Sequence, residues 1–411
     1  MPKLNLKTIS DKLLGAGIFL LAAGLTFSLS IMTSGILFLL LVLIMKVFLG
    51  EVKIRSTGLE KPLFLFFAFY FISAFLSPDS SKSIAYIFRK FWYILAMYEV
   101  YYLFEERDMN RFFRTLVWST AILAIFSAGQ ALIGLNFALE FSVGDNFRLK
   151  APQLFRVFEN SSLHLYHATG LFGSPMTFGG QMLMLVFVVF AFFEKKWQSW
   201  TASAAFLLSF SYSVWFGFTF AASYYYHKVR KKPLKSVLGI FLFIILVISI
   251  PGNYSKLSNL LKDRIESWKV SASFHAENPW FGVGPGGFDD FVKANPEAFP
   301  ETFTASTPHS ESMYLRKLVC GGVFSFVTFL YLILVASKRF GGVSRLMKER
   351  WKRFYYASCT GLGAIMLAGF FHTYLSTPVN AVLIWTLAGV ILKLKDSSWS
   401  HSMLIPSQDI D

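Results

Sequence analysis

The chain has 411 residues, of which 55% are hydrophobic and 15% charged, and its formal net charge is +15. A water-soluble fold of this composition would expose far too much apolar surface relative to its charged surface. The composition therefore predicts an all-α, multi-pass integral membrane protein. The positive charge would suit nucleic acid only on a folded polar domain, and the sequence contains none, so we expect no nucleic-acid partner. Cys320 and Cys359 both lie in apolar segments, which indicates neither a disulfide framework nor a thiol metal site.

Apolar windows of about twenty residues predict membrane spans along most of the chain. The windows lie at 13–30, 33–49, 62–77, 84–104, 112–135, 175–193, 236–251, 313–337, 354–374 and 378–394. The first follows several lysines but has no clear cleavage site after it, so we interpret it as an uncleaved span. Residues 197–227 have basic clusters at both ends, and two short crossings that turn near Tyr212 keep both clusters on one side. The prediction is about twelve transmembrane helices.

Basic residues predict the orientation of these spans, because Lys and Arg collect in cytoplasmic loops. The short turns on the other side carry Lys82 as their only cation. Both chain ends are then cytoplasmic, and residues 136–174 and 252–312 lie on the outer face, which is the periplasm in a Gram-negative cell. We predict that the chain is divided into four parts. Residues 1–251 form transmembrane helices with a first periplasmic loop, and residues 252–312 form a large periplasmic loop with an interfacial helix. Residues 313–395 form further transmembrane helices, and residues 396–411 form a cytoplasmic tail.

Charged residues within the predicted spans are few. Arg89 and Lys90 lie in the outer part of the fourth span, and Arg316 and Lys317 lie at the outer end of a later one. A charge in the bilayer is a candidate functional group, although Arg and Lys near a span end also reach the headgroups by snorkelling. Arg89 and Lys90 are therefore candidates for contact with a ligand at the outer leaflet.

The first long outer loop contains Arg148 and Arg156 and continues into a segment rich in Gly and Pro, from His167 to Gly180. Gly and Pro at this density, where a span begins, indicate a tight re-entry into the membrane with backbone exposed at the interface. The loop thus adds cations and an imidazole to the outer face.

The second long outer loop contains a predicted amphipathic helix. Its apolar positions recur at helical spacing, at Leu257, Leu261, Ile265, Trp268 and Ala272, which is typical of a helix lying on a membrane surface. Arg264 lies one turn before Trp268, where its guanidinium either binds phosphate through paired donors or only reaches the interface. His309 precedes the next span, which suits either a general base near the membrane plane or a hydrogen-bonded surface residue.

The outer face therefore combines cations with histidines. Cations at headgroup depth suit a lipid that carries a phosphate or diphosphate, and an imidazole with an unperturbed pKa of about 6.5 suits a general base. No nucleotide-binding loop, zinc spacing or Ser-His-Asp signature is present, and Asp289-Asp290 lacks a third ligand in the sequence. We therefore expect no metal and no cofactor.

Four segments in this order resemble the O-antigen ligase and polymerase-like membrane proteins. They are Gly170-Leu-Phe-Gly-Ser-Pro175, Arg264-x-x-x-Trp268-x-x-x-Ala272, Asn278-Pro-Trp-Phe-Gly-Val-Gly284 and His309-Ser followed by Tyr314-Leu-Arg-Lys-Leu-Val-Cys-Gly-Gly322. The resemblance implies a GT-C-type glycosyltransferase of the bacterial inner membrane, active on its periplasmic side in lipopolysaccharide biosynthesis. Its ligases move a glycan from undecaprenyl diphosphate to the lipid A core oligosaccharide without metal.

By this resemblance Arg264 binds the diphosphate and His309 is the base for the acceptor hydroxyl. The expected substrate-binding residues are Arg89, Lys90, Arg148, Arg156, His167, Trp268, Tyr212 and Arg316. Two positions depart from the family pattern. Ser211-Tyr-Ser-Val-Trp215 stands where Ser-Arg-Gly-x-Trp is common, so Tyr212 replaces a cation, and the spacing after His309 is longer than usual.

Three functions remain open at this point. A ligase is the first hypothesis, and a polymerase of the same family, whose acceptor is a second lipid-linked repeat unit, is the alternative. A membrane transporter is the alternative of another class, but transport generally needs ionisable or broken-helix sites near the midplane, whereas the polar groups here gather on one face. The sequence predicts membrane lipids as partners and leaves the oligomeric state open.

Overall fold

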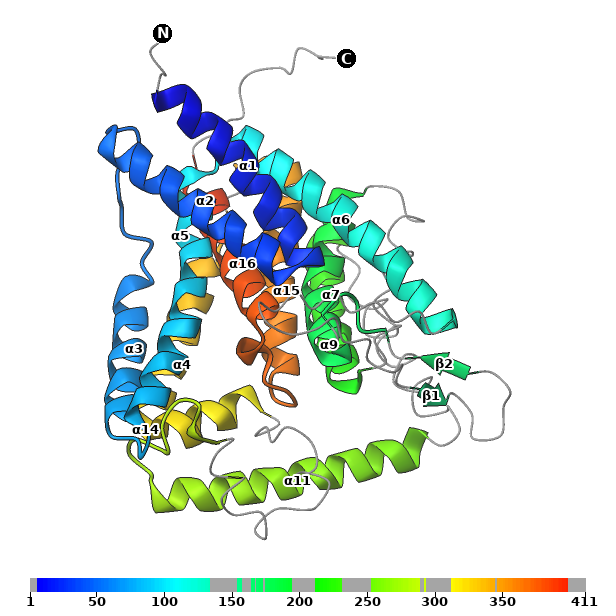
Figure 1. Cartoon of the computed structure of the whole chain (residues 1–411). Coiled ribbons are helices and arrows are strands. Elements are labelled where there is room, and N and C mark those ends of the chain that lie inside the picture. Colours follow the sequence, from blue (N-terminus) through cyan, green and yellow to red (C-terminus); the bar gives the residue numbers. More distant parts are fainter. Residues whose placement is uncertain are drawn as a thin grey trace.

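The computed structural model describes residues 6–133, 154–156, 164–166, 168–172, 174–193, 211–230, 253–288, 292, 312–343 and 346–397. Helices dominate these residues, which confirms the predicted helical architecture (Figure 1). The exception is two short antiparallel strands, β1 (Leu154–Arg156) and β2 (His164–Tyr166), in which Arg156 is paired with His164. Apart from this small hairpin, the described residues agree with the all-α prediction.

The helices follow most of the predicted spans. They are α1 (Leu6–Phe27), α2 (Leu29–Phe48), α3 (Glu60–Phe75), α4 (Ser80–Phe91), α5 (Leu95–Leu103), α6 (Glu106–Ile133), α7 (Pro175–Phe192), α9 (Tyr212–Tyr225), α11 (Asn253–Glu277), α14 (Met313–Phe340), α15 (Glu349–Ala368) and α16 (Pro378–Asp396). Shorter turns of helix lie at Trp92–Ile94, Tyr226–Arg230 and Tyr374–Ser376.

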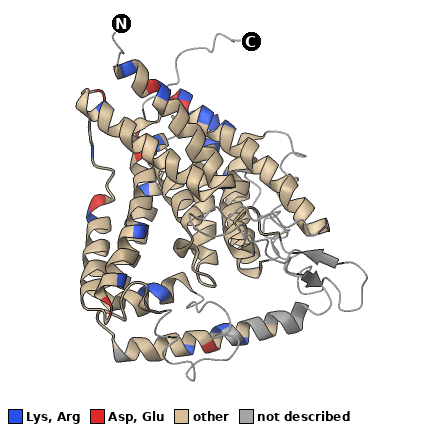
Figure 2. Cartoon of the chain, in the orientation of Figure 1, with Lys and Arg blue, Asp and Glu red and all other residues tan. Residues whose placement is uncertain are grey.

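Six of the described helices are long and apolar enough to cross a membrane: α1, α2, α6, α7, α14 and α16. The chain is thus a multi-pass membrane protein. The predicted span at 236–251 and most of the predicted crossing before Tyr212 lie outside the described residues, so the total of twelve stays a prediction. Figure 2 shows Lys and Arg gathered at the end of the bundle that holds both termini, which is the end predicted to be cytoplasmic.

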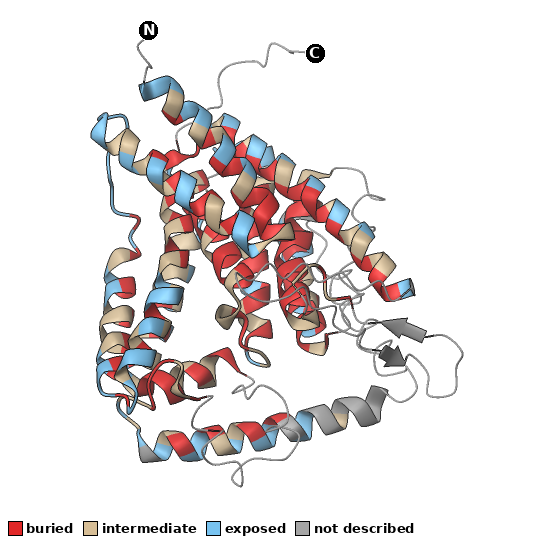
Figure 3. Ribbon diagram, viewed as in Figure 1, coloured by how far each residue is buried: buried red, intermediate tan, exposed pale blue. Residues whose placement is uncertain are grey.

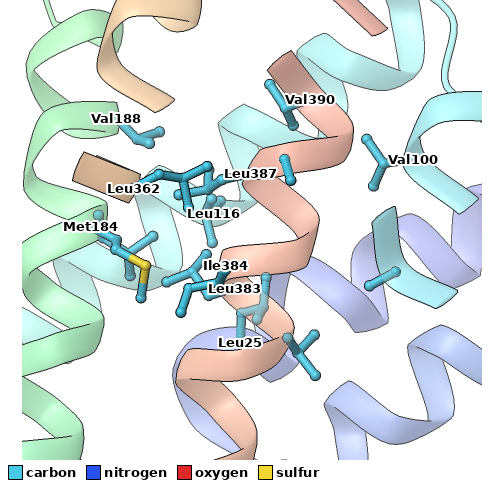
Figure 4. Close-up of a cluster of buried hydrophobic side chains, with 14 of the residues drawn as sticks. Leu25, Val100, Leu116, Met184, Val188, Leu362, Leu383, Ile384, Leu387 and Val390 are labelled. Carbon is cyan, nitrogen blue, oxygen red and sulfur yellow. The ribbon is translucent and has the colours of Figure 1, made fainter. Parts of the chain in front are cut away.

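The core is built around α16, which packs against α5, α7 and α15. Both α7 and α16 are apolar around most of their circumference, a pattern that favours complete burial of a helix, and Figure 3 shows both almost wholly buried. Figure 4 shows the side chains that meet in this core, including Leu25, Leu116, Met184, Leu362 and Leu383. This rigid centre holds the ends of α15 and α16 and the loop between them in place.

Helices α1 and α2 approach each other closely through glycines. A Cβ on Gly24 would lie 2.2 Å from the backbone nitrogen of Met32, and one on Gly35 would lie 2.4 Å from that of Leu21. We expect Gly24→Ala to lower the thermal unfolding midpoint by several degrees, because overpacking a tight interface typically costs about 1–3 kcal/mol. Gly15→Ala on the same helix is the matched control, since its Cβ would meet no atom within 4 Å. Equal midpoints for the two variants in a detergent melting assay would contradict the prediction.

One helix runs across the end of the bundle, transverse to α3 and α5. This helix, α11, lies at the end away from both termini, beside the first part of α14 (Figure 1). The amphipathic helix predicted from the sequence is thus present as α11, and its location at the membrane surface stays a prediction. It contributes Arg264 and Trp268 to the region of the candidate site.

Candidate functional site

The turn that follows α11 packs against a break in α14. Gly322 has a φ of 67°, so α14 bends there and the carbonyls before it are left without regular helical partners. The backbone N–H groups of Val283 and Gly284 donate to the carbonyls of Val319 and Cys320, each at 3.0 Å. The Gly-rich motif found in the sequence is therefore a backbone clamp on α14.

The clamp depends on close backbone contact. Val323 donates its N–H to the carbonyl of Pro279 at 2.9 Å, and the hydroxyl of Ser73 on α3 donates to the Cys320 carbonyl at 2.9 Å. A Cβ on Gly322 would lie 2.1 Å from the Trp280 carbonyl oxygen. Only glycine fits here, and the break turns the segment Met313–Gly321 away from the axis of the rest of α14.

This turned segment carries two cations that meet a third from α4. Arg316, Lys317 and Lys90 all line one cavity of about 720 Å³ that lies between α3, α4, α9, α14, α15 and α16. We call these three residues the cation cluster. Lys317 and Lys90 lie close enough for their charges, and that of Arg316, to repel one another. Such an arrangement favours an anionic ligand.

Aromatic rings and backbone oxygens hold the two lysines. The Lys317 ammonium lies 4.4 Å from the centre of the Tyr70 ring and donates to the Tyr70 hydroxyl at 3.4 Å. The Lys90 ammonium donates to the carbonyl of Ser376 and lies 5.7 Å from the ring centres of Tyr86 and Tyr93. Cation–π contacts stabilise an ammonium without neutralising it. Among the described residues, no Asp or Glu lines the cavity or forms an ion pair with either lysine.

Arg264 lies outside that cavity, at a second site beside the loop between α15 and α16. It is 6% exposed, lies on the face of α11 that also buries Ser267, Ser271 and Phe274, and donates from Nη1 to the carbonyl of Phe371. The Trp268 ring lies 6.2 Å from the Phe371 ring. Arg264 is thus fixed against the loop between α15 and α16.

Helix α11 does not bury the apolar face that the sequence predicts. Leu261 and Ile265 of the predicted apolar face are 41% and 47% exposed. The buried face instead carries Arg264, Ser267, Ser271 and Phe274, because the neighbouring loop offers a carbonyl for the guanidinium and the small serines allow close approach. The exposed apolar stripe lies beside it and is available for contact with lipid.

The loop 369–377, between α15 and α16, contacts both Arg264 and the cation cluster. The carbonyl of Phe371 accepts from Arg264 and that of Ser376 accepts from Lys90, while Tyr374 shares a hydrogen bond with Ser213 on α9 at 2.9 Å. The N–H of Met313, at the start of α14, donates to the carbonyl of Gly369 at 2.8 Å. The sequence predicted only a short external turn here, and nothing in its composition indicated these contacts.

The structure places the remaining predicted residues as follows. Arg89 is exposed, donates to the Ala85 carbonyl of its own helix and does not line the cavity. Tyr212 begins α9 half-buried, with its ring 5.7 Å from that of Trp215, and is also outside the cavity lining. Arg156 is described by its backbone alone, in β1. Arg148, His167 and His309 lie outside the described residues.

Of the predicted binding residues, Lys90 and Arg316 are therefore brought together in one cavity, and Arg264 and Trp268 share a second place. Sequence reasoning had noted Lys317 but did not assign it to the site, and it missed Tyr70, Phe371 and Ser376 altogether. Within the described ranges no three His, Cys, Asp or Glu side chains are grouped as a metal site would need.

Comparison with protein families gives one match. Residues 177–330 match the family model described as O-antigen ligase. This stretch contains α9, α11, the glycine clamp and the first part of α14 with its two cations. No curated protein matches the chain.

Proposed function

Since residues 177–330 form a domain of the O-antigen ligase family, we propose that the chain is a glycosyltransferase acting on a lipid-linked glycan. The donor is a glycan on undecaprenyl diphosphate and the acceptor is the lipid A core oligosaccharide. The reaction takes place at the outer, periplasmic face of the bacterial inner membrane.

The observation that carries this proposal is the setting of Arg264. Arg264 is almost fully buried on a helix that lies across the end of the bundle, and burying a charged group costs free energy unless partners compensate for it. One of its nitrogens holds the Phe371 carbonyl, which fixes the orientation of the planar group. A fixed guanidinium offers the paired donors that a phosphate accepts.

In the proposed reaction the acceptor hydroxyl oxygen attacks the anomeric carbon of the donor sugar. The bond from this carbon to the diphosphate oxygen breaks, and His309 takes the proton of the hydroxyl. Arg264 stabilises the negative charge that develops on the departing undecaprenyl diphosphate. No metal is required, because the cations of the protein supply this stabilisation.

The other predicted contacts have supporting roles in this proposal. Lys90 and Arg316 bind the lipid phosphate at the cavity, and Trp268 holds the α15–α16 loop beside Arg264. Arg89, Arg148, Arg156, His167 and Tyr212 are proposed to contact the glycan or the headgroups around it.

The test is glycan transfer by the purified protein. The full chain in phospholipid nanodiscs is incubated with a lipid-diphosphate-linked glycan and lipid A core, and the product is followed by gel mobility and mass spectrometry. We expect transfer in the presence of a chelator, and the same rate with and without added divalent cation. A protein that binds both lipids but transfers no glycan would overturn the proposal.

A polymerase of the same family is the second candidate, because the matched family model covers the domain that both would share. Lipopolysaccharide from cells lacking the gene separates the two. Bare core with full-length polymer left on the carrier indicates a ligase, whereas core bearing single repeat units indicates a polymerase.

A further inference from the structure

The first turns of α6 carry a group of arginines that the proposed reaction does not use. Arg107, Arg111 and Arg114 are exposed and recur every three or four residues, which places them on one face of the helix. Together with Glu106 and Asn110 they line a hollow of about 520 Å³. We call the three arginines the arginine face. Figure 1 shows α6 beginning at the end of the bundle that holds both termini, away from α11.

The carboxylates in the first turn of α6 already have cationic partners. Glu106 accepts a hydrogen bond from Trp351 Nε1 at 3.2 Å and lies 3.6 Å from the Lys348 ammonium, both at the start of α15. Asp108 lies 3.9 Å from the guanidinium of Arg111. These two carboxylates therefore cancel little of the charge on the rest of the arginine face.

The other two arginines have no acidic partner in the part of the chain that the structure describes. No carboxylate there forms an ion pair with Arg107 or Arg114. The charge of Arg350 on α15 is attracted by Glu106 and repelled by Arg114 and Arg353, so more cations gather beside the face. A cluster of guanidinium groups favours an anion, and phosphate accepts their paired N–H donors.

The same face of α6 continues as an exposed apolar stripe. Trp118 lies one turn beyond Arg114, and Ile122 and Ile125 follow at helical spacing, with the three side chains 56% to 75% exposed. Tryptophan is typical of the membrane interface. From Arg114 to Ile125, α6 rises about 17 Å at 1.5 Å per residue. This is close to the thickness of one leaflet of the hydrocarbon core, about 15 Å.

Helix α2 shows that an exposed apolar stripe alone is not such a site. Its exposed side chains include Leu41 and Ile44, but the nearby Lys46 ammonium lies 3.0 Å from Asp11 and 3.4 Å from Glu51. The cation beside that stripe is therefore already neutralised by the protein. Helix α6 combines an apolar stripe with cations whose charge is available to a ligand.

We propose that this face of α6 binds one anionic glycerophospholipid of the cytoplasmic leaflet, such as phosphatidylglycerol. Its phosphate lies at the arginine face and an acyl chain lies along Trp118, Ile122 and Ile125. An acidic protein partner would match the arginines, but the stripe is one leaflet long and begins with an interfacial tryptophan, which favours a lipid. The site is separate from the proposed transfer reaction, because it lies at the end of the bundle opposite α11.

Quenching of tryptophan fluorescence by brominated lipids tests the proposal. The purified full-length protein in detergent is titrated with phosphatidylglycerol or phosphatidylcholine carrying the same brominated acyl chains. The signal of Trp118 is the difference between the natural protein and Trp118→Phe. We expect phosphatidylglycerol to quench this signal at a mole fraction at least about tenfold lower than phosphatidylcholine, because only its headgroup has a net negative charge. Excess glycerol phosphate should not displace it, since the acyl chain contributes through apolar burial.

Substitution of the unpaired arginines supplies the second arm. Arg107→Gln and Arg114→Gln should each weaken phosphatidylglycerol by about fivefold, and together they should remove its preference over phosphatidylcholine. Arg111 stays unchanged because it pairs with Asp108. Lys61→Gln is the matched control: Lys61 is an exposed cation three residues before the exposed Phe64 on α3, and its loss should leave quenching of Trp118 at the natural value.

Equal quenching of Trp118 by the two lipids in the natural protein would overturn the proposal, and this comparison holds even if a variant fails to fold. An unchanged lipid preference in a double variant with a natural unfolding midpoint would overturn it as well. Displacement by glycerol phosphate would show that a free phosphate is the ligand. If the double variant instead separates a dimer into monomers in nanodiscs without a change in lipid preference, the face is a contact between copies and the lipid proposal is wrong. None of these measurements depends on glycan transfer, so the two proposals fail separately.

Discussion

Replacing Arg264 with alanine is expected to lower glycan transfer by about 100-fold or more, the scale seen when one donor to a developing anion is removed from an active site. The physical reason is that Arg264 is nearly buried and held by the Phe371 carbonyl, so water cannot readily take its place beside the diphosphate. The measurement is the initial rate in the nanodisc assay, with donor binding determined in parallel. The loss should appear mainly in the rate at saturating donor, because the charge on the leaving group grows in the transition state.

Two further variants make this prediction specific. Arg264→Lys keeps the charge but loses the planar fork, so we expect it to recover only a small part of the activity. Lys269→Ala removes a cation from the exposed side of the same helix and should leave transfer within about twofold, because exposed charges contribute little. Both proteins need unfolding midpoints near that of the natural chain. Full activity in a well-folded Arg264→Ala protein would remove Arg264 from the proposed mechanism.

Much of the architecture follows from apolar periodicity, and the reasons are visible in particular helices. The window at 378–394 corresponds to α16 (Pro378–Asp396), and the run from Tyr254 to Trp268 lies in α11 (Asn253–Glu277). Segments of this length and hydrophobicity have few alternatives in a bilayer, because their backbone groups must be paired within the segment. The observed boundaries differ where polar residues precede the apolar run, as in α1 (Leu6–Phe27) against a predicted start at 13. They also differ where the predicted span 84–104 is divided between α4 and α5.

The arrangement of the cations could not be predicted in the same way. Arg89 and Lys90 are neighbours on α4, and consecutive residues of a helix point about 100° apart. One of them faces the cavity and the other is exposed, a difference set by how α4 packs rather than by its sequence. The same limit applied to Arg264, whose partner Phe371 lies 107 residues further along the chain.

The break in α14 was also beyond sequence reasoning. Gly321-Gly322 reads as part of a continuous apolar span, and the clamp residues Gly282 and Gly284 read as a surface turn. Only the structure, in which the turn packs against α14, shows that the turn supplies N–H donors to the carbonyls that the break exposes. A local motif in one segment thus determines the shape of another.

The second large effect is expected for Gly282→Ala, which should disrupt the clamp and lower both stability and transfer. Gly282 has a φ of 66°, where a residue with a Cβ costs about 1–2 kcal/mol, and its Cβ would lie 2.2 Å from the Val319 carbonyl oxygen. The turn must move to relieve this contact, so the hydrogen bonds from Val283 and Gly284 to α14 are lost together. We expect an unfolding midpoint several degrees lower and transfer reduced by at least about tenfold.

Transfer falls in this prediction because the clamp orients the segment that carries Arg316 and Lys317. When the carbonyls of Val319 and Cys320 lose the N–H groups of the turn, α14 can straighten through Gly322, and the two cations then leave the cavity that Lys90 faces. Gly287→Ala is the matched control within the same turn: its Cβ would lie 3.8 Å from the nearest side-chain atom of Val283, so both readouts should stay near natural values. A Gly282→Ala protein as stable and as active as Gly287→Ala would show that the break in α14 persists without the clamp, and the orientation of the cation cluster would then need another cause.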